Sequence, residues 1–142
     1  MRLSPAAGYA IRAVLYMAAQ TPDRRCEAQE IAQQEDIPVQ FLWKVLQLLC
    51  RGGLLQSVRG TGGGYRLAVS PEQIPLIAIV EAVGNSTGAD ECLLRFQNCS
   101  SDAPCALHER WAGLKAQFSE LLEKTTVADL VRDCRREKGE PV

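Results

Sequence analysis

The sequence contains a single histidine, His108, and no apolar run long enough to cross a membrane. One imidazole without a nucleophile motif leaves few groups for catalysis, so an enzyme with a small-molecule substrate is disfavoured. Cys105 lies close to His108, but no third group is placed to orient a thiol–imidazole pair. Near the start of the chain, Arg12 interrupts a helically spaced apolar stretch, which indicates a structural helix rather than a secretory leader. We therefore expect a cytoplasmic protein.

Acidic residues are absent from a long internal segment. None occurs between Asp36 and Glu72. The same segment contains four basic residues, Lys44, Arg51, Arg59 and Arg66. After Pro71 the balance reverses, with 12 acidic against 8 basic residues, and the net charge of the whole chain is only −1. A locally positive segment in a nearly neutral chain predicts a local anion-binding face.

Hydrophobic periodicity and turn residues predict a mainly α-helical chain with one small β-hairpin. Ser4 and Pro5 are typical of a helix start, and the apolar stripe that follows consists of Ile11, Val14, Leu15 and Ala18. Thr126 with Asp129 is typical of a capping box before a last short helix. We expect further helices over 28–34, 39–50, 70–83 and 106–124, and strands over 54–58 and 65–69. No internal repeat or low-complexity tract is present.

Two helices, a turn, a third helix and a hairpin are the order of a winged helix-turn-helix. The hairpin tip over 59–64 contains four glycines among six residues, so its backbone can approach a surface closely. The candidate DNA-binding residues are Gln40, Trp43, Lys44 and Gln47 on the third helix and Ser57, Arg59, Gly60, Thr61, Gly62, Gly63 and Tyr65 in the hairpin.

Each part of this set has a chemical reason. Glutamine pairs with adenine edges, and lysine pairs with phosphate or guanine. Arg59 at a hairpin tip can enter a narrow minor groove, where the potential is most negative. The glycine run alone is also consistent with a loose hairpin, and Trp43 at such a position is more often a packing residue than a base contact. Together the features predict a double-stranded DNA operator as a partner.

The chain contains six cysteines, and three of them gather before the histidine. Cys92, Cys99 and Cys105 lack the close pair of a zinc ribbon, and their wide spacing on a polar, turn-rich loop suits an iron–sulfur cluster, 2Fe–2S or 4Fe–4S. His108 follows Cys105 by one helical turn, so both can face one centre. Zinc, a reversible disulfide, and a histidine that is simply exposed remain alternatives. We expect Cys50 to be a small core residue.

These pieces together resemble the Rrf-two family of bacterial winged-helix regulators, which includes the regulators IscR, NsrR and RirA. The resemblance rests on GYAIRAVLYMA, RGTGGGYRLA and CALHERW, and it spans nearly all of residues 1–135. It implies a homodimer with crossing long helices and a cluster bound by Cys92, Cys99 and Cys105. The Leu-His-x-x-Trp sequence resembles the IscR branch, which implies His108 as the fourth ligand. The implied dimerisation residues are Trp111, Leu114, Phe118, Leu121 and Leu122.

The expected organisation is a DNA-binding domain over 1–84, a cluster loop over 85–105, a dimerisation segment over 106–135 and a tail over 136–142. The predicted function is a transcriptional regulator that senses iron, cluster supply, nitric oxide or redox state. The alternatives are a cluster-free regulator of the same fold, switched by zinc or thiol oxidation, and a small iron–sulfur electron carrier. No membrane partner is expected.

Overall fold

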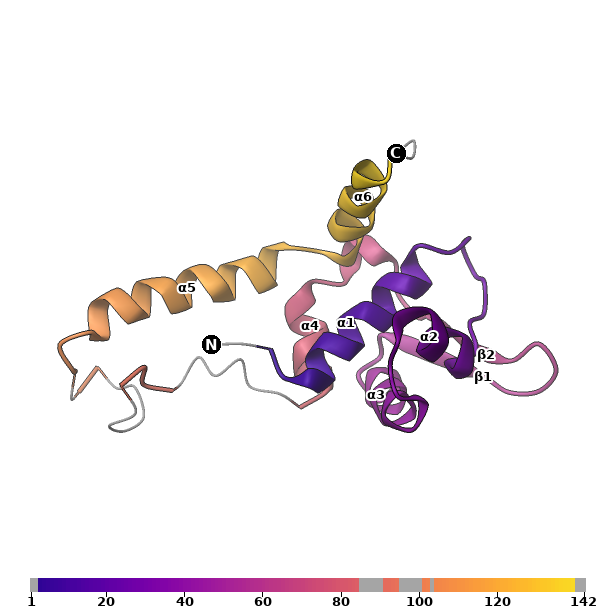
Figure 1. The fold of residues 1–142 in the computed structure, drawn as a ribbon, viewed down its shortest axis with the longest axis horizontal. Coiled ribbons are helices and arrows are strands. Elements are labelled where there is room, and N and C mark those ends of the chain that lie inside the picture. Colours follow the sequence, from indigo (N-terminus) through magenta and orange to yellow (C-terminus); the bar gives the residue numbers. More distant parts are fainter. Residues whose placement is uncertain (1–2, 85–90, 95–100, 103, 140–142) are drawn as a thin grey trace.

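A computed structural model of the chain describes residues 3–84, 91–94, 101–102 and 104–139. Within these ranges most of the chain is helical (Figure 1). The elements, in order, are α1 (Pro5–Ala18), α2 (Ala28–Glu35), α3 (Val39–Arg51), β1 (Leu55–Val58), β2 (Gly64–Leu67), the short 3-10 helix η1 (Pro71–Gln73), α4 (Leu76–Ala82), α5 (His108–Lys124) and α6 (Val127–Glu137). No helix in these ranges is both long and apolar enough to span a bilayer.

The first three helices and the hairpin form a winged helix-turn-helix. Helix α3 packs against α1 and α2, and the two strands pair antiparallel with Leu55 opposite Leu67. The loop before α2 extends this pairing, because the backbone N–H groups of Cys26 and Tyr65 each donate to the other residue's carbonyl at 2.8 Å. The predicted fold class is confirmed, and the second strand of the hairpin is attached to the loop before α2.

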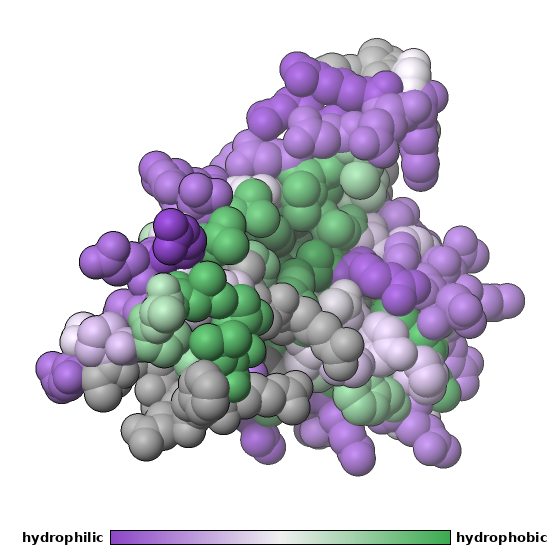
Figure 2. All heavy atoms as spheres, turned by 60° about the vertical axis from the view of Figure 1, so that its left-hand side comes forward, coloured by the Kyte–Doolittle hydropathy of each residue, from purple (hydrophilic) through white to green (hydrophobic). Residues whose placement is uncertain are grey.

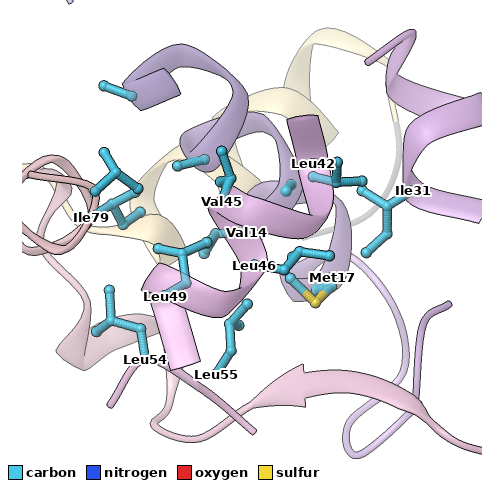
Figure 3. Packing of buried hydrophobic residues seen from close by; sticks show 14 of the residues in the cluster. Val14, Met17, Ile31, Leu42, Val45, Leu46, Leu49, Leu54, Leu55 and Ile79 are labelled. Atoms are coloured by element: carbon cyan, nitrogen blue, oxygen red, sulfur yellow. The ribbon is translucent and has the colours of Figure 1, made fainter. Parts of the chain in front are cut away.

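The core lies where α1 and α3 meet (Figure 3). Helix α1 begins as predicted, since the Ser4 hydroxyl accepts a hydrogen bond from the Ala7 N–H at 3.1 Å. Its most buried face carries mainly small residues, and the expected stripe packs against the core with Val14 as its only fully buried member. The buried residues are Ala7, Ala10, Ala13, Val14 and Met17, whereas Ile11, Leu15 and Ala18 are only partly buried. Alanine on the inner face lets the large side chains of α3 approach closely.

The single helix expected over 70–83 is instead two pieces. Ile74 has extended backbone with φ −111° and ψ 93°, and Pro75 is the N-cap of α4. A proline disfavours helical geometry in the residue before it, so the break follows from the sequence. The extended segment is used for pairing: the Leu76 N–H donates to the Thr125 carbonyl and the Val127 N–H to the Ile74 carbonyl, both at 2.9 Å. This pairing fixes the junction between α5 and α6.

Helix α5 projects away from the winged domain, whereas α6 returns to lie against α1 (Figure 1). Only Trp111 and Leu122 of α5 are buried. Helix α6 begins with the predicted capping box, in which Thr126 and Asp129 each accept a hydrogen bond from the other's backbone N–H. A projecting helix with few buried residues leaves most of its apolar surface uncovered.

Candidate nucleic-acid interface and metal centre

The outward face of α3 carries the four residues predicted there. Gln40, Trp43, Lys44 and Gln47 are all exposed. They recur at i, i+3, i+4 and i+7, so they form one stripe along the helix. The opposite face is packed into the core through Leu42, Val45, Leu46 and Leu49 (Figure 3).

Phe41, next to this stripe on α3, is 39% exposed. Its ring meets Tyr9 of α1 edge-on, with 5.4 Å between the ring centroids and an interplanar angle of 75°. The Arg12 guanidinium lies 5.8 Å from the centroid of Tyr9. This small aromatic contact joins the first turn of α3 to α1 and leaves the stripe itself unobstructed.

The hairpin tip is a structured turn rather than a loose one. Gly60, Gly62 and Gly64 have positive φ angles of 92°, 72° and 143°, which side-chain-bearing residues rarely adopt. The Gly63 N–H donates to the Gly60 carbonyl at 2.9 Å and closes the turn. Arg59, Gly60, Thr61 and Gly62 are exposed. The tip therefore presents the arginine side chain on a defined backbone.

Arg25 contacts the wing, and it was not among the residues predicted from the sequence. It lies in the loop before α2, and its Nη1 donates to the Gly62 carbonyl at 3.4 Å. The only sequence signal is the adjacent basic pair Arg24 and Arg25, since the two bonded residues are 37 positions apart. Arg25 adds a fifth basic side chain to the predicted anion-binding face.

A cleft of about 480 Å³ separates α3 from the wing. Its lining residues are Gln47, Cys50, Arg51, Ser57, Val58, Arg59, Gly64 and Tyr65. Arg51 and Arg59 are exposed, and in the described part of the chain neither is in an ion pair. Unpaired cations from two elements around one cleft are suited to an anionic ligand.

Cys50 is half-buried in this cleft, so the expectation of a core residue holds only in part. Burial raises the pKa of its thiol. Burial also raises the pKa of Tyr65, and the neighbouring Cys50 adds to that rise. Both side chains therefore stay protonated at neutral pH and add no negative charge beside the arginines.

A polar cluster fixes the loop that carries Arg25. The Tyr16 hydroxyl and the Arg24 Nη2 both donate to Glu30 Oε1 at 2.6 Å. The hydrogen bond from Tyr16, followed by those from Arg24, holds the pKa of Glu30 below its ordinary value. Arg24 Nη1 also lies 3.4 Å from the Cys26 sulfur. Cys26 is fully buried, and this burial raises the pKa of its thiol. These hydrogen bonds hold the loop before α2 in place, so the cluster has a structural role.

The cysteine loop is described only at its two ends. Cys92, Cys105 and His108 are half-buried, and Cys99 lies outside the described residues. The His108 N–H donates to the Cys105 carbonyl at 3.0 Å, so these two residues share the turn that begins α5. In the ranges that the structure describes, no three His, Cys, Asp or Glu side chains gather in a way that would hold a metal ion.

A hydrogen bond closes the loop at its neck. The Trp111 Nε1 donates to the Glu91 carbonyl at 3.0 Å, and Trp111 is buried. This bond attaches the residue before Cys92 to the first turn of α5, which begins at His108, three residues after Cys105. Trp111 was predicted as a dimerisation residue, and no local pattern in the sequence indicates its contact with Glu91.

The predicted dimerisation residues fall into two groups. Leu114 and Leu121 on α5 are 52% and 56% exposed, whereas Trp111 and Leu122 are buried within the chain. Phe118 is partly buried against the core. Figure 2 brings the α5 side of the molecule forward and shows hydrophobic surface exposed within a hydrophilic surround. An exposed apolar surface of this kind is typical of a protein interface.

Comparison with known proteins identifies the chain by its sequence. Residues 3–133 match the Rrf2 family, which is described as an iron-dependent transcriptional regulator. The chain belongs to the Rrf2 family. A protein of Aquifex aeolicus named as an HTH-type transcriptional regulator is 37% identical over 133 residues, which cover 92% of each chain. The HTH-type transcriptional regulator IscR of Photobacterium profundum is 32% identical over 133 residues, which cover 94% of this chain and 77% of that protein.

Solved structures share the fold of this Rrf2 protein. CymR of B. subtilis, described as its global cysteine regulator, has a TM-score of 0.80 at 24% identity and is matched over 93% of this chain and 97% of its own. IscR of T. potens has a TM-score of 0.76 at 22% identity, over 96% of this chain and 90% of its own. The chain is therefore a DNA-binding transcriptional regulator of the winged-helix class, not an enzyme.

Proposed function

We propose that this Rrf2 regulator binds its operator as a homodimer and that an iron–sulfur cluster sets its affinity for DNA. The observation that carries the proposal is the hydrogen bond from Trp111 to Glu91. It attaches the start of the cysteine loop to the beginning of α5, the helix proposed for dimerisation. A change within the loop then acts directly on the element that relates two DNA-reading domains.

The proposed DNA contacts use both sides of the cleft between α3 and the wing. The exposed stripe of α3 enters the major groove, where glutamine reads adenine edges and lysine reads guanine or phosphate. Arg59 at the wing tip enters the minor groove, and the surrounding glycine amides meet phosphates. Arg51 faces the same cleft. The phosphate backbone that runs between the two grooves would lie between Arg51 and Arg59.

The proposed cluster ligands are Cys92, Cys99, Cys105 and His108. Their chemistry fits, because thiolates and imidazole are the donors that iron–sulfur centres use. The hydrogen-bonded neck supports the set, since it holds the chain next to Cys92 near the turn that carries Cys105 and His108. When bound, the cluster supplies a centre that responds to iron supply, nitric oxide or oxidants.

The proposed coupling is a shift between two populations of the dimer. Residues 85–105 form the sensing loop, 1–84 read the DNA and 106–135 hold the two copies together. Leu114 and Leu121 supply exposed apolar surface for the second copy. A dimer with two DNA-binding domains requires operator half-sites at a fixed spacing. A small change in how the two α5 helices cross therefore alters the affinity for the operator.

The test is anaerobic purification followed by visible absorption and electron paramagnetic resonance spectroscopy. We expect a coloured protein whose spectrum changes in His108→Ala and is unchanged in Cys134→Ser, a matched variant at an exposed cysteine outside the loop. An unchanged spectrum in His108→Ala removes the histidine from the ligand set. A colourless protein with zinc or no metal favours the cluster-free regulator instead.

The second part of the test is a mobility-shift titration of the operator by the cluster-containing and cluster-free protein. We expect the two forms to differ in affinity because the loop leads into the dimer helix. Equal affinity contradicts the proposed coupling while leaving DNA binding intact. Binding that is weak and insensitive to salt contradicts DNA as the partner, since phosphate contacts are strongly salt-dependent.

A further inference from the structure

Trp43 is an apolar side chain at the centre of an otherwise polar stripe. It stands between Gln40 on one side and Lys44 and Gln47 on the other, and 46% of its surface is exposed. Within the described residues its indole makes no hydrogen bond and no ring contact. An indole that is exposed and has no partner within the chain is available for an external contact.

The position of Trp43 gives it no place in the hydrophobic core. The core-facing side of the same helix is filled by Leu42 and Leu46, both with no exposed surface. A Trp43 side chain that served the core would have to displace one of them. The indole instead points away from the core with the polar residues of the stripe.

The charge around Trp43 selects DNA as its partner. No acidic residue occurs between Asp36 and Glu72, and Lys44 is its immediate neighbour. A surface of this charge is complementary to phosphate, and a protein partner that needed an apolar anchor would not require it. The exposed apolar surface on α5 offers a separate place for a second copy of the chain.

The major groove offers one apolar group to such a side chain, the C5-methyl group of thymine. The two glutamines on either side of Trp43 are suited to adenine, through its N6 and N7 atoms. All three side chains therefore favour A·T pairs. We infer, on the basis of the proposed DNA-binding function, that Trp43 determines specificity by contacting a thymine methyl group in each operator half-site.

The inference is tested by removing only that methyl group. An operator is first selected from a random duplex library, and each thymine is then replaced in turn by uracil, which base-pairs identically but lacks the methyl. We expect one or two positions per half-site at which uracil weakens binding by about fourfold, the loss that corresponds to one buried methyl group. Trp43→Ala should bind the thymine and uracil duplexes equally.

Gln47→Ala is the matched control on the same stripe. It should weaken binding to both duplexes while the ratio between them stays at its wild-type value. The inference is overturned if uracil has no effect at any position in the wild type, or if Trp43→Ala still distinguishes the duplexes. Absence of any selected operator would overturn the proposed function as well, so the two failures are distinguishable. Circular dichroism of Trp43→Ala confirms that the exposed substitution leaves the fold intact.

Discussion

At the scale of single residues, the wing depends on glycines that have no room for a side chain. A Cβ atom on Gly64 would lie 2.6 Å from the Cys26 carbonyl oxygen, and one on Gly63 would lie 2.4 Å from the Val58 carbonyl oxygen. These obstacles are backbone atoms, which cannot rotate away. The close approach is what permits the paired hydrogen bonds between Cys26 and Tyr65.

Gly64→Ala should therefore lower the free energy of unfolding by about 1–3 kcal/mol, because it adds a clash to a strained φ angle. The measurement is chemical denaturation followed by circular dichroism. Gly8→Ala in α1 is the matched control, since a Cβ there meets nothing within 4 Å and its φ is not positive. Equal stability of the two variants would contradict the close packing of Gly64 against Cys26.

Cys50 allows the cleft between α3 and the wing to be probed directly. Bound operator should slow alkylation of its thiol several-fold, because the DNA backbone would cover the cleft that Cys50 lines. Burial raises the pKa of this thiol, so its alkylation is slow at neutral pH and becomes faster as the pH rises. Peptide mass spectrometry follows each cysteine separately. Cys134 is exposed and should react at the same rate with and without DNA. Equal alkylation rates of Cys50 with and without operator would show that DNA does not cover this cleft.

At the scale of elements, the stability of α6 depends on the capping box at its first turn. Thr126→Ala removes the hydroxyl that accepts the Asp129 N–H, and we expect a loss of about 1 kcal/mol in unfolding free energy. The same variant should fray α6 from α1, seen as faster amide hydrogen exchange in 127–137. Unchanged exchange would show that packing on α1 holds α6 without its cap.

Asp129 makes the stability of this element depend on pH. The backbone N–H of Thr126, and after it the Arg132 guanidinium, lowers the pKa of Asp129. A lowered folded-state pKa stabilises the fold above the ordinary carboxyl range, and this contribution is lost as the pH falls through the folded value. Asp129→Asn should remove that part of the acid dependence. Asp133→Asn, an exposed position on the same helix, should retain it.

Elements with local signals were predictable, and contacts between distant segments were not. The caps at Ser4 and Thr126 and the exposed stripe of α3 follow from short-range patterns, and the structure confirms them. The break before Pro75 also had a local signal, but helical periodicity obscured it. Nothing in the sequence indicated that Cys26 pairs with Tyr65, because the two residues come together only in the tertiary structure. The cysteine spacing likewise did not reveal the neck of the loop.

At the scale of the whole molecule, the exposed face of α5 should determine the oligomeric state. Leu121→Glu places a charge on surface that the proposed dimer buries, so sedimentation equilibrium should show a shift from dimer to monomer. Ala116→Glu is the control, because the helical repeat places it on the opposite side of α5 and it is exposed. Operator affinity should fall only in Leu121→Glu. If both variants remain dimeric, the two copies meet through another surface.

The bond from Trp111 to Glu91 joins residues 20 positions apart and makes the intervening chain a closed ring. The entropic cost of closing such a loop rises only slowly with the number of residues in it. Residues inserted between Glu91 and Cys105 would therefore cost little stability as long as the hydrogen bond from Trp111 to Glu91 is kept. A chain with this neck can thus accept a different cysteine spacing while its loop stays attached to α5.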